Sequence, residues 1–141
     1  VLKGAYAFFA DLARAIRIPV RVDFIIVTSY GTQTKTSGKV KLVTELTEKI
    51  KNRDVLLVED IVDSGLTVQY LTKALAKQKP RSIKVCTLLS KPERRVVDVP
   101  LQYIGLKIPD QYVVGYGLDY QQQYRNLPYL AVLDQLNQQE E

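Results

Sequence analysis

The 141-residue chain contains no histidine and a single cysteine, Cys86. The absence of histidine excludes histidine metal ligands, histidine general bases and the pairs in which histidine activates a serine or cysteine nucleophile. Cys86 has no partner for an intramolecular disulfide, and its apolar run IKVCTLLS predicts a buried structural thiol. Any acid–base chemistry must therefore use aspartate, glutamate, lysine or tyrosine.

Long apolar runs are also absent. None approaches the roughly 20 residues that a membrane-spanning helix needs, and no secretory signal peptide is recognisable. We therefore expect a cytoplasmic protein without a membrane partner. The 20 lysines and arginines exceed the 15 acidic residues, but they are scattered and form no arginine-rich tract. We expect no nucleic-acid partner, because a small polyanionic substrate or a solubilising surface explains the excess.

The length corresponds to one domain, residues 1–141, with a single core. The chain begins without methionine and in the middle of a strand-like pattern that ends at Leu2, so we expect that a segment upstream is missing. The polar residues near the carboxyl terminus, within 134–141, are expected to fray.

Strand patterns alternate with helix patterns along the chain. Residues 5–16 form an amphipathic helix, and Val68, Leu71 and Leu75 share one face of a second helix that ends before Pro80. The expected strands are residues 20–30, 55–59, 83–89, 102–108, 112–114 and 129–133, and residues 31–40 form a mobile loop or a long hairpin. This order predicts an α/β fold with a mostly parallel, twisted sheet and helices on both faces.

The stretch VLLVEDIVDSGLTVQYL, residues 55–71, places three acids at the end of a buried strand. Glu59 and Asp60 end the apolar run, and Asp63 begins a turn. In open α/β sheets, ligands bind at this carboxyl edge. Two neighbouring carboxylates beside an anion site repel one another unless the ligand supplies hydroxyl groups, a divalent cation or both. A sugar phosphate with Mg²⁺ meets all of these needs.

The turn itself, DSGLT, is small and polar. Gly65 permits close approach, Ser64 or Thr67 could cap the following helix, and the free backbone N–H groups suit an anion. A capped helix after a strand would explain the turn alone equally well. The adjoining acids favour the ligand site.

The pattern of a hydrophobic strand, two acids, two apolar residues, an acid and a Ser-Gly-x-Thr turn resembles the phosphoribosyl diphosphate motif of type I phosphoribosyltransferases. Three further stretches resemble the hypoxanthine/guanine phosphoribosyltransferases: VLKG at 1–4, VTSYG at 27–31 and DQYVVGYGLDYQQQYRNLPY at 110–129. The resemblance implies the type I fold with a small hood over the base. It also implies Mg²⁺-dependent purine salvage, in which phosphoribosyl diphosphate and a 6-oxopurine, hypoxanthine or guanine, give IMP or GMP and pyrophosphate. A homodimer or homotetramer is implied as well.

The resemblance also implies roles for the acids and the turn. Glu59 and Asp60 hold the ribose hydroxyls and help to place Mg²⁺, and Asp119 is the further metal carboxylate. Asp63 is the general base at N7 of the purine. The 5′-phosphate is bound by the turn residues Asp63, Ser64, Gly65, Leu66 and Thr67.

The remaining roles implied by the resemblance lie outside this motif. Lys3, Gly4 and Arg125 bind diphosphate, with a cis peptide bond between Leu2 and Lys3. The root of a flexible lid contains Ser29 and Tyr30. In the base site, Lys91 donates to O6 and Tyr112 stacks on the ring. The backbone of Val113 and the side chain of Asp119 complete this site.

One departure and two alternatives remain. Family members carry a further strand and helix upstream of VLKG, which contribute to the hood. Two other interpretations stay open. One is a phosphoribosyltransferase for another base, xanthine or a pyrimidine, and the other is a non-catalytic regulator that senses phosphoribosyl diphosphate. The joint presence of Asp63, Lys91 and Tyr112 favours the enzyme over the regulator.

Overall fold

The computed structural model describes residues 1–32, 35–44 and 46–133, and only the backbone of residues 29–32 and 35–40. The expected fraying of residues 134–141 falls outside this description. In chain order the elements are α1 (Tyr6–Ala15), β1 (Val27–Thr32), β2 (Lys35–Leu42), β3 (Asp54–Val62), α2 (Leu66–Ala76), β4 (Ser82–Ser90), the 3-10 helix η1 (Pro92–Arg94), β5 (Tyr103–Lys107), β6 (Val113–Val114) and β7 (Ala131–Val132).

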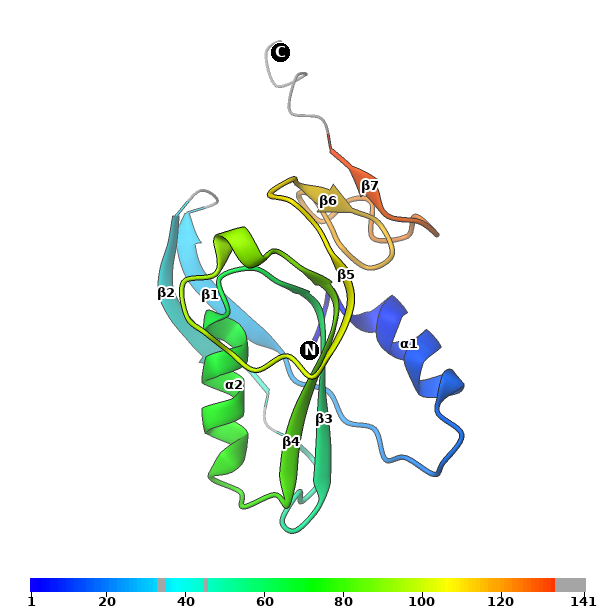
Figure 1. The fold of residues 1–141 in the computed structure, drawn as a ribbon, viewed down its shortest axis with the longest axis vertical. Helices are drawn as coiled ribbons and strands as arrows, with labels where there is room; N and C mark the ends of the chain where they lie inside the picture. The colour runs from blue at the N-terminus through cyan, green and yellow to red at the C-terminus, as the bar shows by residue number, and fades with distance from the viewer. Residues whose placement is uncertain (33–34, 45, 134–141) are drawn as a thin grey trace.

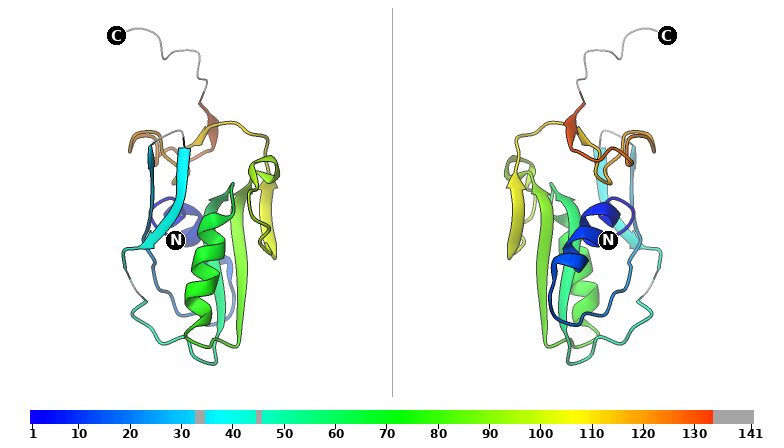
Figure 2. Two further views of the ribbon diagram at one scale, coloured as in Figure 1. Left: turned by 90° about the vertical axis from the view of Figure 1, so that its left-hand side faces the viewer. Right: turned by 90° about the vertical axis from the view of Figure 1, so that its right-hand side faces the viewer.

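The central sheet contains β3, β4 and β5 in that order, all parallel. Leu57 pairs with Val85, and at the carboxyl ends Val62 pairs with Ser90. Helices α2 and α1 lie on opposite sides of β3 and β4 (Figures 1 and 2). The predicted α/β fold, with a mostly parallel sheet and helices on both faces, is confirmed.

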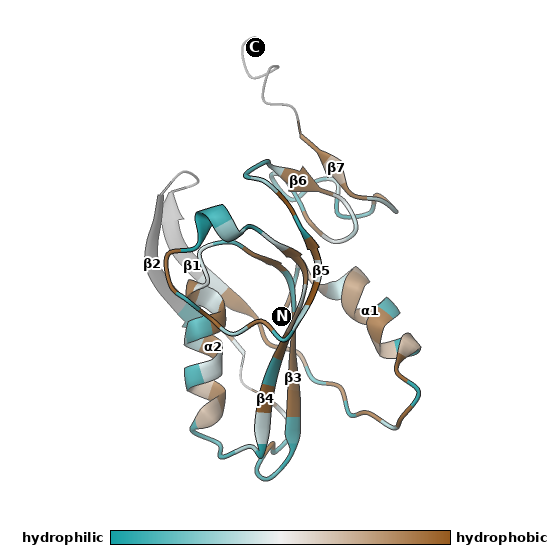
Figure 3. Cartoon of the chain, in the orientation of Figure 1, coloured by the Kyte–Doolittle hydropathy of each residue, from teal (hydrophilic) through white to brown (hydrophobic). Residues whose placement is uncertain are grey.

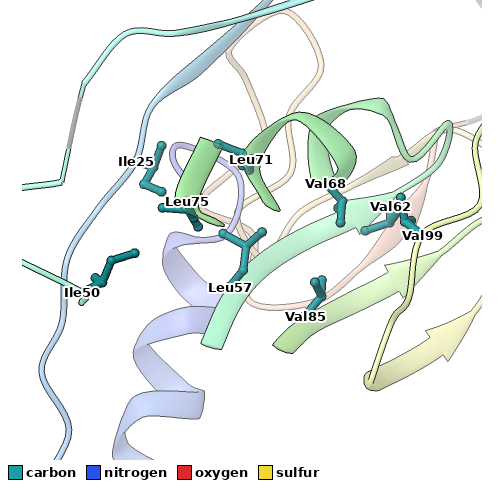
Figure 4. Packing of buried hydrophobic residues seen from close by; sticks show 9 residues of the cluster. All are labelled: Ile25, Ile50, Leu57, Val62, Val68, Leu71, Leu75, Val85 and Val99. Atoms are coloured by element: carbon teal, nitrogen blue, oxygen red, sulfur yellow. The ribbon is translucent and has the colours of Figure 1, made fainter. Parts of the chain in front are cut away.

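The core fills the space between β3, β4 and α2. The predicted face of α2, formed by Val68, Leu71 and Leu75, is buried there against Leu57 and Val85 (Figure 4). Hydrophobic residues occupy the middle of β3, whereas the strand begins with a hydrophilic residue, Asp54 (Figure 3). This pattern is typical of a strand covered on both faces and explains why the local sequence predicted it.

The predicted strand at 20–30 is wrong in its first half. Ile26 makes only an isolated bridge with Leu2, and the ladder with β2 begins at Val27. The β-branched residues before it favour extended backbone, but a strand also needs a partner. Here the carboxylate of Asp23 instead accepts backbone N–H bonds from Phe24, Thr47 and Glu48, which holds the segment as a loop.

Residues 31–40 belong to a hairpin, the second of the two expected forms. Strands β1 and β2 pair antiparallel, with an irregularity between Tyr30 and Gly31. Residues 33–34 lie outside the described residues.

A small hood stands beyond the carboxyl ends of the central strands (Figure 1). It is formed by the antiparallel pair β6 and β7 and the turns between them. Val114 and Leu118, both within the hood, are buried. Cys86 is buried as well, as expected, and burial raises the pKa of its thiol. Among the described residues, no helix is long and apolar enough to cross a membrane.

Candidate active site

The acid pair lies at the carboxyl end of β3, as predicted. Glu59 is only 4% exposed, and its Oε1 atom has no hydrogen-bond partner among the described residues. Burial, reinforced by repulsion from Asp60, raises the pKa of Glu59 to about 8. Burial also raises the pKa of Asp60. Leaving such an acceptor unpaired costs about 1–3 kcal/mol, so Glu59 is suited to accept a hydrogen bond from a ligand.

The VLKG loop lies directly against this pair. A Cβ atom added to Gly4 would lie 1.6 Å from Oδ2 of Asp60. The peptide bond between Leu2 and Lys3 is cis, which confirms the expectation drawn from the resemblance. Gly4 and the acids thus share one site although they are far apart in the sequence.

A pocket of about 200 Å³ combines the acids with the DSGLT turn. Its lining includes Gly4, Glu59, Asp60 and most of the turn: Asp63, Ser64, Gly65 and Thr67. Gly65 has φ +84°, and a Cβ atom there would lie 2.7 Å from the carbonyl oxygen of Val97. Only glycine therefore fits this position of the turn.

The capping role considered for Ser64 or Thr67 is wrong. Gly65 itself is the N-cap of α2, and no side chain caps the helix. The Ser64 hydroxyl instead accepts the N–H of Leu66 at 3.4 Å, and the carboxylate of Asp63 accepts the N–H of Ser64. Ser64 therefore contacts the first N–H of α2 without occupying the N-cap position, which Gly65 fills.

Two of the three predicted diphosphate residues, Lys3 and Arg125, line a neighbouring pocket of about 660 Å³, whereas Gly4 lines the first pocket. Lys3 donates to Oε1 of Gln122 at 3.4 Å, and Arg125 pairs with Asp119 at 2.7 Å. Arg125 also donates to the carbonyl oxygen of Gly117 at 2.8 Å. Lys3 and Arg125 thus line the same pocket, and Asp119 adjoins it through its ion pair with Arg125.

The predicted base residues come from β4 and the hood. Lys91 directly follows β4 and is 8% exposed, while its backbone N–H donates to the carbonyl oxygen of Val62 at 2.9 Å. Tyr112 is 43% exposed, and its hydroxyl donates to the carbonyl oxygen of Asp119 at 3.2 Å. The Tyr112 ring also packs edge-to-face against the ring of Tyr120, with their centroids 5.6 Å apart. Val113 lies in β6, paired with Val132.

The lid residues are placed only by their backbone. Ser29 and Tyr30 lie in β1, opposite Val40 and Lys39 of β2. Their side chains are outside the description, so the lid stays a prediction.

The three proposed metal carboxylates do not form one metal centre. Within residues 1–32, 35–44 and 46–133, no three acidic or cysteine side chains gather closely enough to hold an ion. Asp119 is paired with Arg125 instead. The hard oxygens of Glu59 and Asp60 still fit Mg²⁺ if a substrate supplies further oxygens, because Mg²⁺ commonly binds one or two carboxylates together with phosphate groups.

Two charged residues near the turn, Arg94 and Arg95, were not expected from the sequence. Arg94 lies 3.7 Å from the carboxylate of Asp63 and 3.1 Å from that of Asp110. Arg95 donates to the carbonyl oxygen of Asp63 at 2.9 Å. Their signal was the pair of arginines just after the strand that ends at Ser90, at the same edge as the acids.

Comparison with known proteins decides which family this site belongs to. Residues 1–121 match the model of the phosphoribosyl transferase domain. The chain belongs to this phosphoribosyltransferase family.

Relatives within the family support the resemblance to the hypoxanthine/guanine enzymes. The chain is 52% identical over 134 residues to the hypoxanthine-guanine phosphoribosyltransferase of Mycobacterium avium, covering 95% of this chain and 66% of the relative. It is 48% identical over 131 residues to the hypoxanthine phosphoribosyltransferase of Salmonella typhimurium, covering 93% of this chain and 74% of the relative. This phosphoribosyltransferase chain thus spans about two thirds to three quarters of these relatives.

A solved structure agrees on the fold. A hypoxanthine-guanine phosphoribosyltransferase from Bacillus anthracis, solved with HEPES in its active site, has a TM-score of 0.89 at 50% identity. The match covers 94% of this chain and 78% of that structure. The type I phosphoribosyltransferase fold is confirmed.

Proposed function

We propose that this chain transfers the 5-phosphoribosyl group of phosphoribosyl diphosphate to N9 of hypoxanthine or guanine, a purine salvage reaction that releases pyrophosphate. The observation that carries the proposal is the pocket that joins the buried acids Glu59 and Asp60 to the phosphate turn. A ribose 5-phosphate would supply hydrogen-bonding partners for both the acids and the turn. Its hydroxyls are donors for the carboxylates, and its phosphate accepts backbone N–H groups.

The donor's other groups extend from this pocket. Its diphosphate would reach Lys3, the backbone of Gly4 and Arg125, which line or adjoin the neighbouring pocket. Mg²⁺ would be held by substrate oxygens together with Glu59, Asp60 or Asp119, and it would neutralise charge on the leaving diphosphate. Arg125 and Lys3 contribute positive charge on the same side.

The purine would lie between β4 and the hood. Lys91 would donate to O6, the ring of Tyr112 would stack on the base, and the backbone of Val113 would read the exocyclic group at the far side. Asp63 would accept the N7 proton as general base. Support comes from the sheet register, because Val62 pairs with Ser90 and so Asp63 and Lys91 leave adjacent strand ends.

The proposed reaction also requires that water be excluded from the site. A ribosyl centre with positive charge would otherwise react with water. The β1–β2 hairpin, which carries Ser29 and Tyr30, is the proposed lid. A homodimer or homotetramer in the cytoplasm is part of the proposal and rests on the resemblance alone.

The test is a turnover assay with phosphoribosyl diphosphate, Mg²⁺ and a panel of hypoxanthine, guanine, xanthine, adenine and uracil. We expect IMP from hypoxanthine, with one pyrophosphate released per IMP. A nucleotide formed only from xanthine or uracil would replace the proposed substrate. Saturable donor binding without nucleotide formation from any base would point to a sensor instead.

A further inference from the structure

A short segment behind the phosphate turn holds its backbone. This segment, Arg95–Val97, is called the strap here. The guanidinium of Arg95 donates to the carbonyl oxygen of Val62 at 3.3 Å and to that of Asp63 at 2.9 Å. The N–H groups of Val96 and Val97 donate to the carbonyl oxygen of Ser64 at 3.0 and 3.1 Å. Three successive carbonyl groups of the turn are therefore bound by the strap.

This arrangement sets the direction of the turn's N–H groups. A trans peptide unit is planar, and its C=O and N–H bonds point in opposite directions. Fixing the carbonyls of residues 62, 63 and 64 on the strap therefore directs the N–H groups of Asp63, Ser64 and Gly65 away from it. On that side the Ser64 N–H donates to the carboxylate of the adjacent Asp63.

The strap is also packed tightly against the turn. A Cβ atom on Gly65 would lie 2.7 Å from the carbonyl oxygen of Val97 and 3.0 Å from Cδ of Arg95. The turn therefore has no space to move toward the strap. Hydrogen bonds and packing together fix one position for the phosphate-binding backbone.

Arg95 connects this turn to the base side. It also donates to the hydroxyl of Ser90 at 3.0 Å, and Ser90 is the buried last residue of β4, next to Lys91. One planar guanidinium thus joins the ends of β3 and β4. Lysine could not reproduce this, because its ammonium lacks the rigid fork of donors.

We propose that Arg95 is a positioning residue for the 5′-phosphate subsite: through the carbonyls of Val62 and Asp63 it directs the turn's N–H groups toward the phosphate. Arg95 itself does not touch the substrate. This inference rests on the proposed function, since it assigns the turn to a 5′-phosphate.

The test compares the binding of IMP and inosine, which differ only in the 5′-phosphate. Calorimetry on the 141-residue chain gives the ratio of the two dissociation constants, and this ratio isolates the phosphate contribution. We expect Arg95→Gln to reduce the preference for IMP by about 10-fold, the factor associated with losing one charged donor's hydrogen bonds. Arg95→Lys should be intermediate. Inosine affinity should change little.

Arg81→Gln is the matched control. Arg81 binds the carboxylate of Asp54 at the opposite end of the same strand. The Arg81→Gln variant also loses the hydrogen bonds of one arginine, here those to Asp54. We expect its preference for IMP to equal that of the parent.

Three outcomes would overturn the inference. One is an unchanged IMP preference in both Arg95 variants. Another is an equal loss of IMP and inosine affinity, which would indicate a general structural role. A third is the same loss in Arg81→Gln. If Arg95→Gln does not fold, Arg95→Lys gives the same reading, because lysine keeps the charge but lacks the rigid fork of donors. Because binding needs no turnover, a parent that binds IMP but forms none would contradict the proposed function and leave this inference testable.

Discussion

The α-carbon of Gly4 lies against the carboxylate of Asp60, so closely that a Cβ atom at Gly4 would fall 1.6 Å from Oδ2. The contact joins the first loop of the chain to the end of β3. A side chain at residue 4 would displace this carboxylate, which the proposal assigns to the ribose and to Mg²⁺.

Gly4→Ala should therefore damage the donor site specifically. We expect the KM for phosphoribosyl diphosphate to rise by about 10-fold or more, because carboxylate hydrogen bonds of this kind are each worth about 1.5–3 kcal/mol. The KM for hypoxanthine should change much less. Steady-state kinetics with each substrate varied in turn measures both values, and an unchanged donor KM in the folded variant would show that Asp60 is not part of the donor site.

Asp63→Asn should lower kcat while leaving donor affinity nearly intact. The amide keeps the shape of the carboxylate but cannot accept the N7 proton, and loss of a general base costs about 10² to 10⁴-fold. Asp98→Asn, which neutralises an exposed acid outside the pocket, is the control. A near-normal kcat in Asp63→Asn would remove the general-base assignment.

Catalysis should require Mg²⁺ or Mn²⁺ and stop when a chelator is in excess. The described residues hold no complete metal site of their own, so we expect the ion and the donor to bind together. Calorimetric titration with phosphoribosyl diphosphate, with and without Mg²⁺, measures this coupling. Equal donor affinity in both titrations would contradict a role for Glu59, Asp60 and Asp119 in metal binding.

Glu59 should make the folded protein less stable as the pH rises. Its pKa is raised from 4.5 to about 8, chiefly by burial, so between these values the folded state holds a proton that the unfolded state has lost. The stabilising contribution is thus complete below about pH 4.5, falls through this window and is lost above about pH 8.

Chemical denaturation of the parent and Glu59→Gln across this range checks the sign. The difference in stability between them should favour the variant increasingly with pH, with a slope approaching about 1.4 kcal/mol per pH unit. A constant difference would mean that Glu59 titrates near its ordinary value in the folded protein.

Local patterns explain which parts of this structure could be predicted. The buried run of β3, the acids at its end and the apolar face of α2 follow from neighbouring residues and sheet geometry alone. The segment at 20–25 could not be judged in this way, because a strand depends on a partner distant in sequence, and Asp23 binds loop N–H groups instead. The N-cap of α2 could not be predicted either, because Gly65 is held by contacts with Val97, which is distant in sequence.

Long-range contacts also account for the site residues that were missed or changed. The strap contacts made by Arg95 join segments about 30 residues apart, and no spacing rule indicates them. Asp119 was expected to bind metal, but its neighbour across a tight turn, Arg125, takes its carboxylate in this structure. Such pairings depend on how the hood folds rather than on residue type.

The most direct test of the account is the ratio of kcat/KM for hypoxanthine and adenine, in the parent chain and in Lys91→Gln. Lys91 offers only N–H donors, while adenine presents an amino group where hypoxanthine presents O6. Because a site built for one hydrogen-bonding group can reject its absence by about 10⁴-fold, we predict strong preference for hypoxanthine in the parent. The preference should shrink in Lys91→Gln, whose amide oxygen can accept from adenine. Equal use of adenine and hypoxanthine by the parent would contradict the 6-oxopurine assignment.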